Sequence, residues 1–228
     1  MADSSAVLFD VDGTLIDSNY LHTVTWWEAL HQNGHTVPMA LVHRSIGMGT
    51  DQLLDHVLGE DRDRDETETL DAAHQALYGR YWPSLVPFAG AAHLLRACAA
   101  RGWTVVLASS ASQRELDVLR KVLDADDAIA AATNSDDVDT SKPAPDLVSE
   151  ALKKVGADSA RSFLVGDTVW DVQAAARAGV RCLAVQSGGF SRDELLTAGA
   201  AEVYEDVATL LAHLDDSLLA EVEAKAGA

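Results

Sequence analysis

Two aspartates, Asp10 and Asp12, directly follow the first apolar run of the chain at residues 6–9. Gly13 lets the chain curl at little steric cost, so both carboxylates can turn into one cleft. Two negative charges this close need a cation between them. The motif does not fit a calcium loop, because its glycine comes at the fourth position rather than the sixth. Taken alone, the pair is also explained if Asp12 simply starts a turn.

A second pair of aspartates follows another apolar run, at residues 162–165. Asp167 and Asp171 are four residues apart, which predicts that both carboxylates lie on one face of the first turn of a helix. Acidic residues are also common as caps at helix starts, so this pair alone has an ordinary structural explanation as well.

A serine pair and a lysine supply groups that suit a phosphate. Ser109 and Ser110 follow the apolar run at 104–108 and lead into a predicted helix. A serine hydroxyl and the backbone N–H groups of the helix start can together form an anion-binding site. Lys142 is one of only five lysines in the chain. Oxygen ligands without His or Cys suit Mg²⁺, whereas a lysine and a serine at a helix start suit a phosphoryl group.

In their order and spacing, four motifs together resemble the haloacid dehalogenase-like superfamily. They are Asp10-Val11-Asp12-Gly13-Thr14, Ser109, Lys142-Pro143, and Gly166-Asp167 with Asp171. The resemblance extends to about residue 214. It implies that Asp10 is the nucleophile and forms an aspartyl phosphate. It also implies that Asp12 protonates the leaving oxygen and then deprotonates the hydrolytic water.

The resemblance further implies a ligand set. Mg²⁺ would be held by Asp10, the backbone carbonyl of Asp12, and Asp167, with Asp171 either a ligand or a neighbour of one. Ser109, Ser110 and Lys142 would bind the phosphate and offset the charge of the transition state, and Thr14 would support the loop.

The elements that must position these residues alternate along the chain. Short apolar runs alternate with longer helical patterns, which predicts an α/β fold with a mostly parallel, doubly wound, Rossmann-like sheet. Chemistry in such sheets lies beyond the carboxyl ends of the strands. The predicted strands are 6–9, 104–108, 129–133, 162–165 and 182–185, and the predicted helices are 89–100, 112–123, 145–154, 168–178 and 191–198.

Residues 17–86 break this alternation, because they contain helical patterns and no convincing strand. We interpret them as an inserted α-helical cap domain, with 1–16 and 87–228 forming the catalytic core; the resemblance implies a cap at the same place. The charged run at 60–71 is expected to be a solvated loop and helix start. The alanine-rich end, 215–228, is expected to be a fraying helix.

Three cap residues are candidates for substrate contact. His22 is expected to face the active site, with a capping or surface role as the alternative. Arg44 and Gly47 belong to a segment similar to the family's substrate loop, which could equally be an ordinary turn between helices. Arg44 could reach a second anionic group. Trp26 and Trp27 favour the core of a cap helix over a place in the pocket.

Composition excludes several classes of partner. The chain has 228 residues, with 17 Lys and Arg against 36 Asp and Glu, a net charge of −19. Such acidity argues against nucleic acid or an anionic membrane surface as a partner. We expect a cytoplasmic protein, because the two cysteines are too few for a disulfide framework and the first residues do not read as a signal peptide or membrane span. A monomer or a homodimer is expected.

The predicted function is a Mg²⁺-dependent phosphatase acting on a small phosphorylated metabolite, either a sugar phosphate or a phosphoglycolate-like acid. The alternative is a phosphosugar mutase of the beta-phosphoglucomutase type. Those mutases, like the phosphonate hydrolases of the superfamily, carry a cap lysine, and residues 17–86 contain none. A catalytically silent binding protein is a further alternative, which the four intact motifs disfavour.

Overall fold

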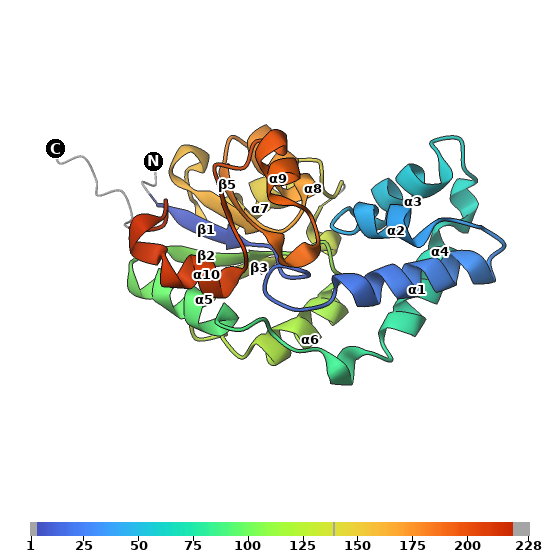
Figure 1. The fold of residues 1–228 in the computed structure, drawn as a ribbon, viewed down its shortest axis with the longest axis horizontal. Helices are drawn as coiled ribbons and strands as arrows, with labels where there is room; N and C mark the ends of the chain where they lie inside the picture. Colours follow the sequence, from blue (N-terminus) through green and yellow to red (C-terminus); the bar gives the residue numbers. More distant parts are fainter. Residues whose placement is uncertain (1–3, 139, 221–228) are drawn as a thin grey trace.

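A computed structural model describes residues 4–138 and 140–220, and in this part of the chain six parallel strands form one sheet (Figure 1). The strand order is β3-β2-β1-β4-β5-β6, so β1 lies near the middle of the sheet, between β2 and β4. The doubly wound α/β fold is therefore confirmed. The strands are β1 (Ala6–Phe9), β2 (Thr104–Ala108), β3 (Ala131–Thr133), β4 (Phe163–Gly166), β5 (Arg181–Val185) and β6 (Glu202–Tyr204).

The two faces of the sheet bury alternate side chains. Leu8 packs with one set of helices, whereas Phe9 packs with the other, as expected from the two-residue period of a strand. Apolar side chains on both faces explain why the central strands read as continuous apolar runs. The helices on the Phe9 face are α5 (Ala91–Ala100), α6 (Gln113–Leu123) and α10 (Val207–Ala212), and those on the Leu8 face are α7 (Asp146–Val155), α8 (Val169–Arg177) and α9 (Arg192–Ala198).

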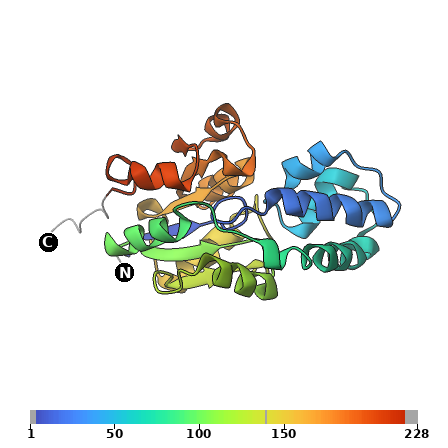
Figure 2. The same ribbon diagram turned by 60° about the horizontal axis from the view of Figure 1, so that its bottom comes forward.

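Four further helices lie together beyond the carboxyl ends of the strands (Figures 1 and 2). These cap helices bury their own apolar cluster, which includes Trp26, Leu30, Leu54 and Leu70. All strands of the described chain lie outside 17–86, which supports the predicted division into core and cap; the boundaries themselves stay a prediction. The cap helices are α1 (Asn19–Gln32), α2 (Met39–Ser45), α3 (Thr50–Leu58) and α4 (Thr67–Tyr78).

Most predicted elements outside the cap are confirmed with small shifts at their ends, but β6 and α10 were not predicted. β6 has only three residues and one fully buried side chain, Val203, so it carries no clear period. Short 3-10 helices connect several elements. They are Arg64–Glu66, Trp82–Ser84, Ser135–Asp137, Ser159–Arg161, Gln186–Gly188 and Leu214–Asp216.

Two further expectations concern charged or terminal segments. The run at 60–71 is a loop and helix start as predicted, except that the side chain of Arg62 is only 3% exposed and binds Asp55. The predicted helix at 215–228 is wrong for residues 215–220, because the chain forms a short 3-10 helix that ends at Asp216 and then turns. Residues 221–228 lie outside the described residues. No helix of the described chain is long and apolar enough to span a membrane.

Replacing Leu8 tests the importance of the central strand. Leu8 is fully buried in β1, so Leu8→Ala is expected to lower the free energy of unfolding by about 2–5 kcal/mol through lost burial and a cavity. Urea unfolding measures the change. The matched control, Leu196→Ala, removes a side chain that is 42% exposed and should change stability by about 0.5 kcal/mol or less. Equal losses in both variants would contradict this account.

Candidate active site

Neighbouring strands bring Asp10 and Asp167 together. Asp10 follows β1 and Asp167 follows β4, and these two strands pair in parallel, so their carboxyl ends meet at one edge of the sheet. The hydroxyl of Thr14 joins the two carboxylates, with Oγ1 2.8 Å from Oδ1 of Asp167 and 3.2 Å from Oδ2 of Asp10. Asn19, at the start of α1, donates from Nδ2 to Oδ2 of Asp167 at 2.8 Å.

The ammonium group of Lys142 lies between two of the aspartates. It contacts Oδ1 of Asp10, and its Nζ is 2.8 Å from Oδ1 of Asp171. The side chain of Lys142 is fully buried. Burial alone would lower the pKa of this lysine, but the charges of Asp10 and Asp171 outweigh it and raise the pKa. Lys142 therefore carries a fixed positive charge in the interior.

Asp171 has a structural role as well as this charged contact. It lies in the first turn of α8 and forms a capping box with Thr168. Its Oδ2 accepts hydrogen bonds from the backbone N–H of Thr168 at 3.1 Å and from the hydroxyl of the same residue at 2.6 Å. Asp171 thus caps the start of α8, as the structural explanation predicts, and it also lies beside the site, as the functional explanation predicts.

Three buried carboxylates fit a hard divalent cation. Asp10, Asp167 and Asp171 each offer one oxygen, and these oxygens lie within 4.8 Å of one another. Burial raises the pKa of Asp10 to about 7, although Lys142 partly offsets it. Burial and the charges of Asp10 and Asp171 raise the pKa of Asp167 well above its usual range. A cation bound among these oxygens would relieve that repulsion, and oxygen donors suit Mg²⁺.

Glycine is required where the loop after β5 passes the site. A Cβ atom at Gly188 would lie 1.7 Å from Oδ2 of Asp167, so any other residue there would displace this carboxylate. Gly13 has a φ of +77°, and a Cβ there would lie 2.5 Å from the same oxygen. Backbone therefore packs directly against Asp167 from two loops.

Asp12 is oriented by partners from α1 and the segment before it. Ser18 donates from Oγ to Oδ1 of Asp12 at 2.6 Å, and Nε2 of His22 is 3.2 Å from the same oxygen. Burial alone would raise the pKa of Asp12, but the hydrogen bond and charge of His22 and the hydrogen bond from Ser18 lower it. His22 thus faces the site, and Asp12 is held as a carboxylate in the free protein.

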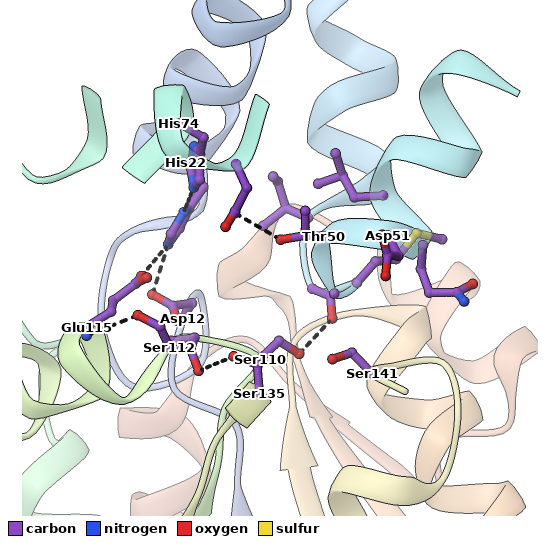
Figure 3. Close-up of a pocket in the computed structure, with 18 of the residues that line it drawn as sticks. Asp12, His22, Thr50, Asp51, His74, Ser110, Ser112, Glu115, Ser135 and Ser141 are labelled. Atoms are coloured by element: carbon purple, nitrogen blue, oxygen red, sulfur yellow. Dashed lines mark hydrogen bonds and ion pairs between the residues drawn. The ribbon is translucent and has the colours of Figure 1, made fainter. Parts of the chain in front are cut away.

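His22 also joins the cap to the core through a cluster of buried polar groups (Figure 3). Its Nε2 is 3.4 Å from Oε1 of Glu115, which comes from core helix α6, and its Nδ1 is 3.4 Å from Nε2 of His74 on cap helix α4. The ring of Tyr78 stacks on His22 at a centroid distance of 3.9 Å. His74 in turn stacks on Trp26 at 4.2 Å.

The titration of these groups follows from burial and charge. Burial alone would lower the pKa of His22, but Asp12, Glu115 and Asp10 raise it. Burial raises the pKa of Glu115 to about 7, and the charge of His22 only partly offsets this. Burial and the charge of His22 lower the pKa of His74 well below its usual value, so His74 is the neutral member.

A pocket of about 380 Å³ lies between the core and the cap. Asp10, Asp12, His22, Gly47 and Ser110 line it, and so does Trp26, whereas Trp27 is 37% exposed and stacks on His31. Five of the ten sequence-predicted site residues thus line this pocket, and Lys142, Asp167 and Asp171 lie beside Asp10.

Two loops that close the pocket meet at Gly47 and Ser110. The hydroxyl of Ser110 is 3.5 Å from the carbonyl oxygen of Gly47. Gly47 has a φ of +97°, and a Cβ there would lie 2.9 Å from the side chain of Thr168. Ser109 is fully buried behind this lining, and its Oγ accepts a hydrogen bond from the backbone N–H of Ala111 at 3.1 Å.

Arg44 is placed away from the pocket, which does not support its expected contact with a substrate anion. Its guanidinium forms an ion pair with Glu194 and lies over the ring of Phe190, 3.8 Å from the ring centroid. The physical reason is that a carboxylate and an aromatic ring of the core are within reach of the Arg44 guanidinium. The charge of Arg44 therefore stabilises the contact between cap and core. Trp170 adds to this contact by donating from Nε1 to the carbonyl oxygen of Arg44 at 3.0 Å.

Several functional candidates were missed from the sequence. Asn19, His74, Tyr78 and Glu115 belong to no motif, and their side chains meet the site only through the packing of cap on core. Glu115 resembles an ordinary acidic residue in a first helical turn, because its backbone N–H is capped by Ser112. Helix periodicity could have marked His74 and Tyr78 as sharing a face of α4, but not what that face contacts.

Comparison with known proteins agrees with the geometry. Residues 5–179 match the haloacid dehalogenase-like hydrolase family. The chain belongs to this family. It is 30% identical over 220 residues to a phosphoglycolate phosphatase from Rhodospirillum rubrum, covering 90% of this chain and 88% of the relative. These similarities identify the protein as a phosphatase of the family.

Solved structures give the same result for the fold. The crystal structure of a hydrolase from Pseudomonas syringae has a TM-score of 0.88 and 34% identity, covering 93% of this chain and 99% of that chain. The structure of CbbY from Rhodobacter sphaeroides in complex with phosphate has a TM-score of 0.75 and 24% identity, covering 94% and 100%. At that lower identity, the likeness to CbbY concerns the fold alone.

The pKa of Glu115 gives a test of the buried cluster by pH. Because the pKa of Glu115 in the folded protein is about 7 rather than 4.5, the folded state holds more protons than the unfolded state between these pH values. Stability from this group therefore falls as pH rises through that window. Relative to Glu115→Gln, the wild-type free energy of unfolding should fall by on the order of 1–3 kcal/mol from pH 4.5 to pH 7.

Urea unfolding at the two pH values measures this difference. The matched control is Glu68→Gln, at an exposed residue of α4. The difference in free energy of unfolding between this variant and wild type should be the same at both pH values. A gap between wild type and Glu115→Gln that stays constant with pH would contradict the raised pKa.

Proposed function

We propose that the protein is a Mg²⁺-dependent phosphatase that hydrolyses a small-metabolite phosphomonoester through an aspartyl phosphate on Asp10. The substrate is a sugar phosphate or an acid such as phosphoglycolate, the compound for which the Rhodospirillum relative is named. The observation that carries this proposal is the buried contact of Lys142 with Asp10, beside two further carboxylates and next to the pocket that Asp10 lines.

Mg²⁺ would be held by Asp10, Asp167 and the backbone carbonyl of Asp12, with Asp171 beside them. When bound, the ion would offset the negative charge of the phosphoryl group and of its aspartate neighbours. The support for this ion is the donor set, since every side chain in it offers oxygen and all are buried.

The nucleophile in the proposal is Asp10. One of its oxygens contacts Lys142 and the other is near Thr14, so the carboxylate is fixed in direction before substrate binds. In the first step, an oxygen of Asp10 forms a bond to phosphorus while the bond from phosphorus to the leaving oxygen breaks. Lys142, Ser109 and Ser110 bind the phosphoryl oxygens and offset their charge.

Asp12 transfers protons in both steps. It gives a proton to the leaving oxygen, and it then accepts a proton from the water that attacks the aspartyl phosphate and returns Asp10 as a carboxylate. The pKa of Asp12 is low in the free protein because of His22 and Ser18. An anionic substrate bound beside Asp12 raises that pKa, which favours uptake of the proton to be transferred.

The mutase alternative is not favoured. The relative that matches over most of its length is a phosphatase, and no lysine lies among the described residues that line the pocket. A cytoplasmic location and a monomeric or homodimeric state stay part of the proposal. Both cysteines are free and buried in the structure, in keeping with a reducing compartment.

Replacing the nucleophile tests the reaction class. Asp10→Asn is expected to lower the rate of phosphate release at least about a thousandfold, because an amide cannot form the aspartyl phosphate. Phosphate release from a panel of phosphorylated metabolites is measured with Mg²⁺ and with EDTA, and circular dichroism checks folding. Asp193→Asn, an exposed residue of α9, is the matched control. Substantial activity in pure Asp10→Asn, or full wild-type activity in EDTA, would overturn the proposal.

Replacing Asp12 tests the second step. Asp12→Asn should slow hydrolysis of the phosphoenzyme by about 10²–10⁴-fold, because no base then activates the water. After mixing with substrate and quenching in acid, mass spectrometry should show the added phosphate on the Asp12→Asn protein and none on Asp10→Asn. Phosphoenzyme turnover at the wild-type rate in Asp12→Asn would remove Asp12 from the proton transfers.

A further inference from the structure

The pocket beyond the phosphoryl position is lined by carboxylates and by no lysine or arginine among the described residues. Asp12 and Glu115 lie on one side of it, and Thr50 and Asp51 lie on the other (Figure 3). The acidic side chains of the lining that do not belong to the phosphoryl site are Asp51, Asp71, Glu115 and Asp136. A bound substrate that extends from its phosphate into this pocket therefore meets several acidic groups and no lysine or arginine of the described lining.

The nearby cations are already paired. Arg44 is turned to Glu194 outside the pocket. Arg62 is held by Asp55, with Nε 2.7 Å from Oδ1, and its guanidinium also lies 3.4 Å from Oδ1 of Asp51 at the exposed edge of the lining. Lys142 lies beneath Asp10 and contacts the aspartates of the phosphoryl site. His22, which does line the pocket, is between the carboxylates of Asp12 and Glu115. Each of these four charges is therefore already paired with a carboxylate of the protein.

The cap side of the pocket presents hydrogen-bonding groups. Asp71 accepts from the hydroxyl of Thr50 at 3.1 Å and from Nε2 of Gln75 at 2.7 Å. Burial raises the pKa of Asp71, and the charge of Asp51 adds to this. On the core side, the buried Oε1 of Glu115 has His22 as an ion partner but accepts no hydrogen bond from the described residues. These oxygens accept hydrogen bonds, so they favour ligand groups that donate them.

We infer that the leaving group of the substrate is uncharged and rich in hydroxyl groups, as in a sugar or polyol phosphate, and carries no carboxylate. The inference rests on the proposed phosphatase function and specifies its substrate. A carboxylate placed here would lose hydration and face like charges, while the nearby cations His22 and Arg62 are already paired with carboxylates of the protein, so its burial costs more than it returns. Hydroxyl groups donate to carboxylate oxygens at no such cost. A pocket of about 380 Å³ is of the size that binds a small metabolite.

Matched pairs of substrates test this inference, because each pair differs mainly in one carboxylate. The pairs are glycerol 3-phosphate with 3-phosphoglycerate, glucose 6-phosphate with 6-phosphogluconate, and 2-hydroxyethyl phosphate with 2-phosphoglycolate. In the wild-type protein with Mg²⁺, kcat/KM for the neutral member should exceed that for the acid at least about tenfold, a difference of about 1.4 kcal/mol. Comparable or higher values for the acids would overturn the inference.

Removing two of these charges should reduce the discrimination against acids. In Asp51→Asn combined with Asp71→Asn, kcat/KM for the acid members should rise relative to their neutral partners, because two negative charges of the lining become neutral amides. The control, Asp193→Asn, leaves the pocket unchanged and should leave the ratio unchanged. An unchanged ratio of kcat/KM between acid and neutral substrates in the double variant would show that these two carboxylates do not discriminate between leaving groups.

Two further outcomes separate the inference from the function on which it rests. Phosphoethanolamine has an ammonium group in place of the hydroxyl of 2-hydroxyethyl phosphate. A higher kcat/KM for phosphoethanolamine would overturn the hydroxyl assignment in favour of a cationic leaving group. Absence of phosphate release from every compound, including 4-nitrophenyl phosphate, would instead overturn the proposed phosphatase function itself.

Discussion

The contact of Lys142 with Asp10 and Asp171 is the interaction on which the site depends. Three carboxylates buried at one edge of a sheet repel one another, and a buried lysine alone would lose its proton. Together they are stable, because each charge lowers the cost of burying the other. The pKa of Lys142 is raised despite complete burial. Burial raises the pKa of Asp10 to about 7, because the charge of a single lysine only partly offsets burial and the neighbouring carboxylates. The charge left over is what fits the site to a divalent cation.

The same electrostatic constraint continues into the cap through His22. This residue lies between Asp12 of the core loop and Glu115 of α6, while Tyr78 and His74 of α4 pack against its ring. The position of the cap helices is therefore coupled to the direction of the Asp12 carboxylate. Arg44 adds a further contact between cap and core, through Glu194 and Phe190. The contacts between cap and core thus include His22, which also orients the carboxylate of Asp12.

Charge also explains how one pocket can bind phosphate and still discriminate. Within the described lining, Asp10 is in direct contact with the buried Lys142. Away from it, acidic groups and hydroxyls such as Thr50 and Asp71 replace cations. The overall net charge of −19 adds a general repulsion of anions, so the local positive charge has to be strong for phosphate to enter.

The alternation of strands and helices, the helical insertion, and the motif residues that follow β1, β2 and β4 could all be predicted from the amino-acid sequence. These are local properties, since apolar period and turn chemistry act over a few residues, and parallel strands bring their carboxyl ends together. Three other features became visible only in the folded chain: Glu115 and His74 meet His22, Asn19 binds Asp167, and Arg44 faces Glu194 rather than the pocket. Such contacts join residues 52 to 150 positions apart. Their partners are set by how the cap packs on the core, which no local pattern encodes.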